Sequence, residues 1–368
     1  MMTKPASRGD NGKMRTERLV VDPTRLDEFS ARTALGRAAE ILRSGGLVAL
    51  PTETVYGLGA NALDPVAVVR IFEAKKRPAW DPVIVHIAGP ATAENPMLRR
   101  LVTEIPDTAR RLMEAFWPGP LTLLLPRSTA VPDAVTAGRP LVGVRMPAHP
   151  VAYRLIERAR VPVAAPSANL FSHTSPTNAQ HVLDDLDGRI DAILDAGPTE
   201  HGVESTVLDP CQSPMMIYRP GAITMEQIQA VAGEVKTFTE HLRTIEQPEA
   251  LPSPGVGIRH YAPRARLVLV EGTQEDLPRL LAAEAAHHAS EALGLMRVNE
   301  FEGDATLPFA AVFPWGRWAN PEELAQRLYA GLRALDAAGC TVILCPMPAA
   351  TGIGAALRDR LTKAARRQ

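Results

Sequence analysis

Short apolar segments alternate with segments of helical periodicity along most of this chain, and this alternation constrains its fold more than any other feature. Residues 28–46 place apolar side chains at helical spacing and end on two glycines, and an apolar strand follows directly at residues 47–51. Further strand signals lie at residues 82–89, 121–126, 141–147, 161–169, 191–197, 205–210 and 215–223. Many strands with interspersed helices predict an α/β fold, in which helices cover a mixed, twisted sheet.

A Pro- and Gly-rich stretch at residues 239–264 interrupts this alternation, because it holds neither helical nor strand periodicity for long. Beyond it, strands and helices alternate again, which predicts a second, smaller doubly wound α/β domain. A chain of 368 residues also exceeds the usual size of one hydrophobic core. We therefore predict a flexible tail at residues 1–16, a first domain at 17–238, a linker or lid at 239–264 and a second domain at 265–368.

The composition is that of a globular protein with a formal net charge of -1, which excludes a fibre or a disordered chain. Any nucleic-acid contact would need a local basic patch, because the overall charge gives no attraction to phosphate. The three cysteines include no CxxC pair, which argues against structural zinc and for a reducing compartment. The polar N-terminus lacks a signal peptide's apolar core, and no run is long enough to span a bilayer. We expect a cytoplasmic protein.

The first segment that can bind a ligand is PTETVYGLG, at residues 51–59. It follows a buried strand, where α/β sheets commonly place ligands. The hydroxyls of Thr52, Thr54 and Tyr56 can hydrogen-bond a small polar molecule, and the glycines permit close backbone approach. A strand followed by a glycine turn explains the same residues without a ligand.

Two cations, Lys75 and Arg77, stand two residues apart before Pro78, where the helix predicted over residues 64–78 ends. Both can converge on one anion, Arg77 as a bidentate fork and Lys75 as a point charge, and a triphosphate fits this pair. Cations at the end of a helix also complement the helix dipole. The spacing alone leaves both interpretations open.

His86 and Arg145 lie in apolar strand segments. A histidine among apolar neighbours is more typical of a satisfied core residue than of a functional one. An arginine at the end of a buried strand needs an anionic partner or a route to water. A substrate carboxylate would supply that partner for Arg145.

Further polar residues follow later strands. Ser167, Asn169 and Ser175 come after the apolar run VPVAA at residues 161–165. Short side chains and backbone N–H groups in such a segment can hold phosphate or ribose, or form an ordinary loop. Ser205 and Arg219 lie in two further segments that place a polar residue at a strand, VESTV and IYRPGAI. No HExxH, P-loop or GxGxxG signature is present, so the familiar hydrolase and dehydrogenase classes lose their support.

Eight of these segments resemble, in this order, the YrdC-like family of threonylcarbamoyl-AMP synthases: PTETVYGLG, KxRP, PVIVHI, FWPGPLT, VGVRMPAHP, APSAN, ESTV and YRPG. The resemblance covers about residues 38–222 and is specific, because independent segments agree in sequence and order. The segment SPGVGIRHYAP and the second domain resemble the long, two-domain form of the family. The resemblance implies a nucleotidyltransferase that converts L-threonine, bicarbonate and ATP into threonylcarbamoyl-AMP and pyrophosphate, for the modification of adenosine 37 in tRNA.

The same resemblance implies roles for individual residues. Family positions that hold threonine are matched by Thr54, His86, Arg145, Ala165 and Ser205, with Arg145 suited to the carboxylate and Ala165 to a backbone contact. Family positions on the nucleotide side are matched by Lys75, Arg77, Asp81, Leu141, Ser167, Asn169, Ser175 and Arg219. Catalysis would rest on positioning and on charge neutralisation by Lys75, Arg77 and the Mg²⁺ that accompanies ATP, and no metal site made of protein side chains is expected.

The linker closes over the nucleotide in the family, so His260 and Tyr261 are candidates for a lid. Two departures affect this region. Asp81 stands where the family usually has asparagine, and a carboxylate beside phosphate would repel it unless it faced the metal or a base donor. Gly257-Ile258 stand where the family commonly has a lysine-tyrosine pair, so the lid would grip less tightly.

Two other functions compete with this interpretation. Carbamoyltransferases that form carbamoyl-adenylate contain the same module, but they resemble long fusions with zinc-finger cysteines and an acylphosphatase domain, and this chain has no such segments. A module that binds double-stranded RNA or ribosomal particles is the second alternative, because the concave face of this fold is often basic. The family also implies handover of the product to a separate tRNA threonylcarbamoyl transferase.

Overall fold

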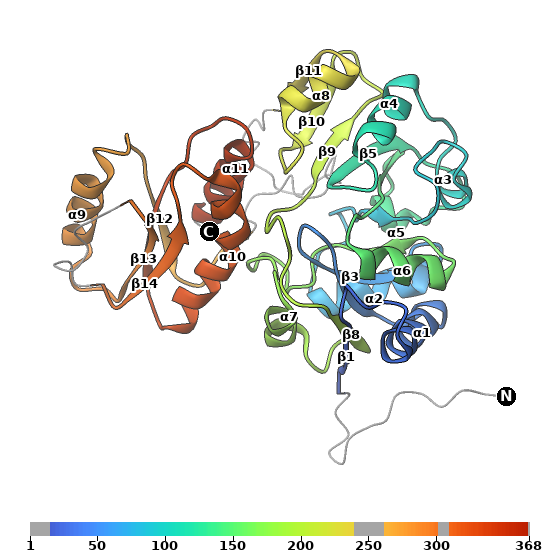
Figure 1. The fold of residues 1–368 in the computed structure, drawn as a ribbon, viewed down its shortest axis with the longest axis horizontal. Coiled ribbons are helices and arrows are strands. Elements are labelled where there is room, and N and C mark those ends of the chain that lie inside the picture. Colours follow the sequence, from blue (N-terminus) through green and yellow to red (C-terminus); the bar gives the residue numbers. More distant parts are fainter. Residues whose placement is uncertain (1–14, 239–260, 301–308, 367–368) are drawn as a thin grey trace.

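The computed structural model describes residues 15–238, 261–300 and 309–366, which form two α/β units with separate sheets (Figure 1). The strands of the first sheet are β1 (Glu17–Val20), β2 (Val48–Pro51), β3 (Tyr56–Asn61), β4 (Val85–His86), β5 (Leu121–Pro126), β6 (Leu141–Arg145), β7 (Val163–Ala164), β8 (Ala192–Asp195), β9 (Thr206–Asp209), β10 (Met215–Arg219) and β11 (Val235–Thr237). Their order is β1-β8-β2-β3-β7-β4-β6-β5-β9-β10-β11, and parallel and antiparallel pairs both occur. The predicted mixed sheet is confirmed.

Helices pack against this sheet, and the helix predicted over residues 64–78 ends three residues earlier, at Lys75. They are α1 (Phe29–Arg43), α2 (Pro65–Lys75), α3 (Pro96–Leu101), α4 (Asp107–Phe116), α5 (Asp133–Thr136), α6 (Pro150–Ala159), α7 (Ala179–Leu186) and α8 (Met225–Ala232). The Asp64 carboxylate caps α2 by accepting hydrogen bonds from the N–H groups of Val66 and Ala67. This helix ends where Lys76 adopts a left-handed conformation with φ of 53°, so the chain leaves the helix just before Arg77.

The second unit is a four-stranded parallel sheet with helices on both faces. Its elements are β12 (Arg266–Val270), α9 (Leu277–His287), β13 (Leu293–Val298), β14 (Ala311–Gly316), α10 (Pro321–Ala337), β15 (Val342–Pro346) and α11 (Gly354–Ala365). The strand order is β12-β15-β13-β14, and all described neighbours are parallel. Figure 1 shows α9 on one side of this sheet and α10 with α11 on the other, toward the first domain. The predicted doubly wound domain is confirmed.

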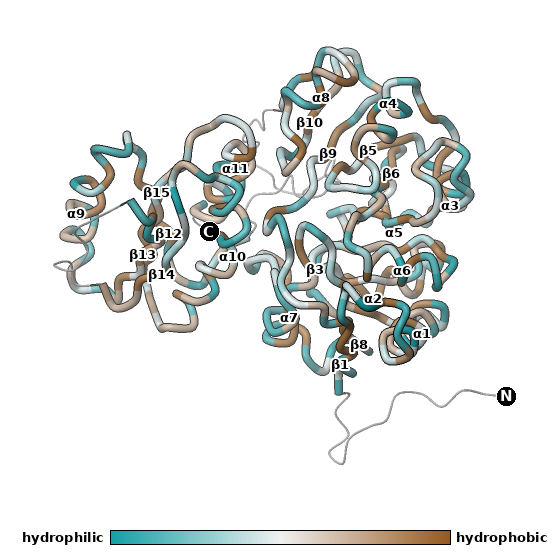
Figure 2. The backbone as a smooth tube through the Cα atoms, viewed as in Figure 1, coloured by the Kyte–Doolittle hydropathy of each residue, from teal (hydrophilic) through white to brown (hydrophobic). Residues whose placement is uncertain are grey.

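Apolar side chains of the strands fill the space between sheets and helices, and their removal from water is the main stabilising contribution. Figure 2 shows hydrophobic stretches along strands such as β8, and alternating hydrophilic and hydrophobic stretches along the helices. The strand β15, which contains Cys345, is buried along its whole length. Cys211, Cys340 and Cys345 are all free thiols.

Three local predictions differ from the structure. The glycine-rich part of PTETVYGLG is not a turn but the strand β3, in which a Cβ on Gly59 would lie 2.9 Å from side-chain atoms of Leu50 and Val163. These glycines therefore serve close packing between strands. The strands β4 and β7 contain only two residues each, fewer than predicted.

The third difference concerns the N-terminal side of the first domain. Thr16, the last residue of the predicted tail, is buried, and its hydroxyl donates a hydrogen bond to the Ile190 carbonyl at 3.1 Å. The strand β1, which follows it, carries no clear strand signal in the sequence. Residues 1–14 and most of the predicted linker, 239–260, lie outside the described residues.

The second domain docks on the first through α10 and α11. Val55 and Val203 of the first domain belong to the same hydrophobic cluster as the core of the second domain. Arg333 on α10 donates hydrogen bonds to the Thr174 carbonyl at 2.6 Å and to the Asp185 carboxylate at 2.8 Å. The two domains therefore meet in a packed interface that has both polar and apolar contacts.

A buried ion pair crosses this interface. Arg360 on α11 donates a hydrogen bond from Nε to Oε2 of Glu204 at 2.7 Å, and both residues are buried. Burial opposes ionisation of Glu204, but the charges of Arg360 and Arg219 outweigh it and lower the pKa of Glu204 to about 2. Removing one partner of such a pair costs about 3–5 kcal/mol, because a buried charge is left without compensation.

Gly202 provides a test of the interface. Its φ is +71°, and a Cβ would lie 2.4 Å from the Gln326 Cα on α10, whereas Gly197 has φ of +83° and open space around it. We expect Gly197→Ala to lower the free energy of unfolding by about 1 kcal/mol through backbone strain alone. Gly202→Ala should lower it by at least about 3 kcal/mol, because it also separates the domains. If chemical denaturation showed the same loss of unfolding free energy for both variants, the close packing of Gly202 against α10 would be contradicted.

The pH dependence of stability provides a second test. Because the pKa of Glu204 falls from 4.5 to about 2 on folding, its ionisation stabilises the protein above pH 4.5 and loses this effect as the pH falls toward 2. Between these pH values, the wild-type protein should lose roughly 3 kcal/mol more unfolding free energy than Glu204→Gln, which cannot titrate. Urea denaturation at a series of fixed pH values measures how the unfolding free energy of each protein changes with pH. If the unfolding free energies of the wild-type protein and Glu204→Gln changed equally with pH, Glu204 would not be held ionised by Arg360.

Candidate functional site

A pocket opens at the centre of the first sheet, and polar and charged side chains form part of its lining. It is lined by Thr52, Thr54, Val55, Gly57, Arg77, Pro82, Val83, Ile84, His86, Arg145, Ala165, Pro166, Ser167, Glu204, Ser205, Arg219 and Tyr261. These residues come from β3, β4, β6 and β10 and from the segments around β2, β7 and β9. Segments that are distant in the sequence therefore converge on one cavity.

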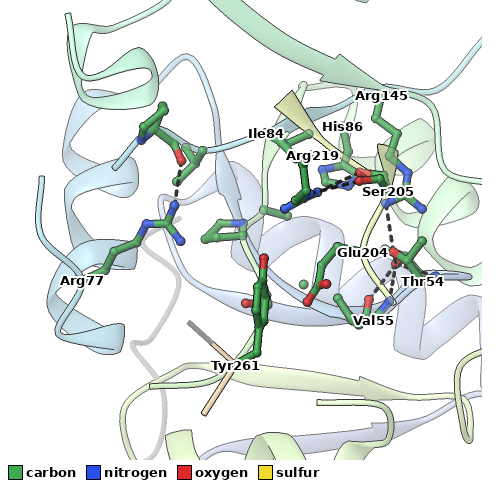
Figure 3. Close-up of a pocket in the computed structure, with 17 residues that line it drawn as sticks. Thr54, Val55, Arg77, Ile84, His86, Arg145, Glu204, Ser205, Arg219 and Tyr261 are labelled. Atoms are coloured by element: carbon green, nitrogen blue, oxygen red, sulfur yellow. Dashed lines mark hydrogen bonds between the residues drawn. The ribbon is translucent and has the colours of Figure 1, made fainter. Parts of the chain in front are cut away.

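The five residues predicted to hold threonine all line this pocket: Thr54, His86, Arg145, Ala165 and Ser205. β4 and β6 pair in parallel with His86 opposite Arg145, which brings the two side chains to the same part of the wall. Arg145 donates hydrogen bonds to the Gly119 carbonyl at 3.2 Å and to the Thr54 hydroxyl at 2.9 Å. Figure 3 shows Arg145 and Thr54 at one end of the pocket and Arg77 at the other.

Glu53 is a functional candidate that sequence reasoning missed. Its Oε1 lies 2.7 Å from Nη2 of Arg145, and the two side chains are only 2% and 4% exposed. Arg145 thus has an anionic partner within the protein, where the sequence predicted a substrate carboxylate. Burial opposes the charge of Glu53, but Arg145 outweighs this and lowers the pKa of the Glu53 carboxyl. The sequence did contain a signal for Glu53, because this residue stands between the two candidate residues Thr52 and Thr54.

His86 is uncharged in this pocket. Burial, together with the positive charge of Arg145, lowers its pKa to about 3. A neutral imidazole adds no positive charge next to Arg145, and each ring nitrogen serves as either a donor or an acceptor. The pocket end at Arg145 therefore carries one arginine, one carboxylate and a neutral histidine.

The two threonines of the first segment form a short hydroxyl chain. Thr52 Oγ1 donates to the Val55 carbonyl at 2.6 Å and lies 2.9 Å from Thr54 Oγ1. Because the Thr52 proton goes to Val55, the Thr54 hydroxyl is the donor between the two. Thr54 accepts from Arg145 at the same time, so its proton can turn from Thr52 to a ligand.

Four of the residues predicted on the nucleotide side also line the pocket: Arg77, Ser167, Arg219 and Tyr261, the last of them from the predicted lid. Arg77 donates to the Pro82 carbonyl at 2.7 Å and forms an ion pair with Asp81 at 2.9 Å. Asp81 itself is fully buried behind this wall. The structure therefore gives the Asp81 carboxylate an arginine neighbour.

Lys75 is not among the residues that line the pocket. Its Nζ donates hydrogen bonds to the carbonyls of Ser167 and Asn169, each at 2.5 Å, and the side chain is 1% exposed. Burial, and then the charge of Arg77, lower the pKa of Lys75 well below its ordinary value. In this arrangement Lys75 holds the backbone of the APSAN segment in place.

The remaining predicted residues lie beside the pocket without lining it. Asn169 contacts backbone carbonyls of its own loop, and Ser175 donates a hydrogen bond to Glu204 at 2.5 Å. Leu141 lines a smaller neighbouring cavity, which shares Pro82 and Val83 with the main pocket. His260 lies outside the described residues.

Ser205 and Arg219 form the wall on the β9–β10 side. Arg219 donates to the Ser205 carbonyl and hydroxyl, each at 3.1 Å, and the Ser205 hydroxyl lies 2.8 Å from that of Thr122. Glu204, which sequence reasoning also missed, stands directly before Ser205 and faces the pocket (Figure 3). Its place in the ESTV segment was the available signal.

Within residues 15–238, 261–300 and 309–366, none of the helices has both the length and the apolar character that crossing a membrane requires. In the same parts of the chain, no three or more His, Cys, Asp or Glu side chains gather into a group that could hold a metal ion.

Two family models match consecutive parts of the chain. A model described as telomere recombination matches residues 40–221, and one described as the C-terminal domain of threonylcarbamoyl-AMP synthase matches residues 223–366. The first match spans the pocket-lining residues from Thr52 to Arg219, and the second spans α8, β11, the pocket residue Tyr261 and the second sheet.

Relatives match nearly the whole chain. The threonylcarbamoyl-AMP synthase of Pyrococcus abyssi is 43% identical over 92% of this chain and 95% of its own length. That of Bacillus subtilis is also 43% identical, over 96% of this chain and 98% of its own. The crystal structure of the Sua5 protein of P. abyssi, complexed with L-threonine, matches with a TM-score of 0.85 and 41% identity over 95% of this chain and 98% of that one. This chain belongs to the threonylcarbamoyl-AMP synthase family, in the form that carries both the YrdC-like domain and the C-terminal domain.

Proposed function

We propose that this protein is an L-threonylcarbamoyladenylate synthase, which forms threonylcarbamoyl-AMP and pyrophosphate from L-threonine, bicarbonate and ATP. The observation that carries the proposal is the pocket end formed by Thr54, His86 and Arg145, in a chain whose 43% identical relatives are named for this activity. The L-threonine complex of the P. abyssi protein supports threonine as a substrate.

The reaction consists of two bond-forming steps. The amine of threonine attacks the carbon of bicarbonate, one carbon–oxygen bond breaks, and water leaves to give a carbamate. A carbamate oxygen then attacks the α-phosphate of ATP, and the bond to the β-phosphate oxygen breaks as pyrophosphate leaves. Both steps depend on holding three small molecules in one orientation, which an enclosed pocket provides.

Threonine is proposed to bind at the Arg145 end. Its carboxylate would accept hydrogen bonds from the Thr54 hydroxyl, which is able to turn its proton, and would interact with the Arg145 guanidinium. Glu53 keeps Arg145 in plane by pairing with Nη2. His86, neutral at pH 7, would hydrogen-bond the polar groups of threonine without adding charge, and Ser205 and the Ala165 backbone would complete the subsite.

ATP is proposed to bind toward Arg77, Ser167 and Arg219. Two arginines at this end would neutralise the phosphates, with Asp81 keeping Arg77 close to the pocket until the nucleotide arrives. Mg²⁺ is expected as part of the ATP complex, because Glu204, the one carboxylate among the described residues that line the pocket, is already paired with Arg360. Lys75 and Ser175 would act indirectly, Lys75 by holding the loop at Ser167 and Ser175 through its hydrogen bond to Glu204.

The product is an activated acyl-adenylate, so a second enzyme has to transfer its threonylcarbamoyl group to adenosine 37 of tRNA. We propose a separate tRNA threonylcarbamoyl transferase as that downstream partner and the cytoplasm as the compartment. Rapid handover is expected, because mixed anhydrides of carbamate and phosphate hydrolyse readily in water.

The direct test supplies the purified protein with ATP, Mg²⁺, bicarbonate and each amino acid in turn, and measures pyrophosphate release together with the acyl-adenylate by mass spectrometry. We expect release that requires both threonine and bicarbonate. Turnover that requires carbamoyl phosphate instead would identify a carbamoyltransferase. Absence of turnover, with salt-sensitive binding of double-stranded RNA, would identify a binding module.

Arginine-to-lysine variants test the two ends of the pocket separately. Arg145→Lys keeps the charge that Glu53 requires but removes the planar fork, so KM for threonine should rise about tenfold or more while KM for ATP stays within about twofold. Arg77→Lys should show the opposite pattern. Arg154→Lys, an exposed arginine paired with Glu157, serves as the control and should leave both constants unchanged. A threonine effect in Arg77→Lys would reverse the assignment.

A further inference from the structure

One arginine of the second domain reaches three segments that form or border the pocket. Arg360, on α11, contacts Glu204 through Nε at 2.7 Å and donates from Nη2 to the Pro220 carbonyl at 2.9 Å. Its guanidinium also lies over the Tyr261 ring, 5.1 Å from the centroid. Glu204 and Tyr261 line the pocket, and Pro220 directly follows the pocket residue Arg219.

We propose that Arg360 is a positioning residue of the active site, through which the second domain holds the nucleotide side of the pocket in its working shape. This inference rests on the function proposed above and assigns part of it to the second domain. Arg360 is fully buried and is not among the residues that line the pocket, so it acts through the residues that it orders.

The Glu204 carboxylate binds Arg360 and also accepts hydrogen bonds from residues of both domains. It accepts hydrogen bonds from Ser175 at 2.5 Å, from the Tyr329 hydroxyl at 3.0 Å and from Arg360. Ser175 belongs to the first domain, whereas Tyr329 lies on α10 of the second. A change in the docking of the second domain would therefore move the pocket wall at Glu204.

Tyr261 is held from two sides by the second domain. Its ring stacks on that of Tyr329, with centroids 5.9 Å apart, and Arg360 approaches it as a cation over an aromatic face. Tyr261 is buried and has φ of 65°, an unusual conformation for a residue with a side chain. The two contacts fix this ring at the mouth of the pocket, beside Glu204 (Figure 3).

The Pro220 contact extends this ordering to Arg219. Because Pro220 is bonded to Arg219, a hydrogen bond to the Pro220 carbonyl fixes the turn from which the Arg219 guanidinium reaches Ser205. Among the described residues, Arg360 makes no hydrogen bond or ion pair with the threonine-side residues, and it reaches Ser205 only indirectly, through Arg219. Loss of Arg360 should therefore affect ATP far more than threonine.

The charges around Arg360 determine how the test has to be designed. Arg360 also pairs with Asp359, which in turn pairs with Lys363 at 2.9 Å. Removing Arg360 alone leaves Glu204 partly uncompensated and destabilises the fold. A double variant, Arg360→Met with Glu204→Gln, removes both charges and separates a defect in folding from a defect in positioning.

The experiment compares Arg360→Met, the double variant and the control Arg358→Met, which lies on the same helix and pairs with the exposed Glu271 of the second domain. ATP–Mg²⁺ binding is measured by calorimetry without threonine, steady-state constants by pyrophosphate release, and stability by thermal unfolding. We expect Arg360→Met to weaken ATP binding about tenfold or more, with KM for threonine within about threefold. Arg358→Met should bind ATP like the wild type.

The double variant decides between positioning and charge balance. We expect it to recover most of the thermal stability that Arg360→Met loses and still to bind ATP at least about fivefold more weakly than the wild type. Recovery of both properties would overturn the proposal, as would unchanged ATP binding in Arg360→Met. Failure of the proposed function is distinct, because it would appear as no threonine-dependent pyrophosphate release by the wild-type protein.

Discussion

The ion pair between Glu204 and Arg360 joins the two domains at the wall of the pocket. Both groups are buried, where an isolated charge is costly, so each requires the other and the docking of the domains becomes specific. Around this pair, Val55 and Val203 insert into the apolar cluster of the second domain. The segment that contains Thr54 is consequently supported by both domains.

A second buried pair, between Glu53 and Arg145, organises the Arg145 end of the pocket. Arg145 is therefore already paired with Glu53 and hydrogen-bonded to Gly119 and Thr54 before any ligand binds. Such a preorganised arrangement loses little freedom when a carboxylate arrives, and the neutral His86 beside it avoids repulsion between cations. The pocket thus has two ends of related design, each built on an arginine held by an acidic residue.

Much of the fold was predictable from local pattern. The helix ending at Gly45-Gly46, the strand at residues 141–147 and the alternation of the second domain all follow from periodicity and helix-stop residues. The glycines of β3 were misread as a turn, because the strands that approach them, at Leu50 and Val163, are known only once the sheet is assembled. The two-residue strands β4 and β7 were overestimated for a similar reason, since apolar runs continue beyond the paired residues.

The sequence by itself determined the α/β class and the residue types that can bind threonine and a nucleotide, because periodicity and local motifs are properties of neighbouring residues. Only the tertiary structure decided that Arg145 is paired with Glu53, that Lys75 supports a loop instead of lining the pocket, and that Arg360 reaches Glu204 across 156 positions of the chain. Partners of buried charges are chosen by which segments the sheet and the domain interface bring together. That choice depends on the packing of the whole chain and leaves no local mark in the sequence.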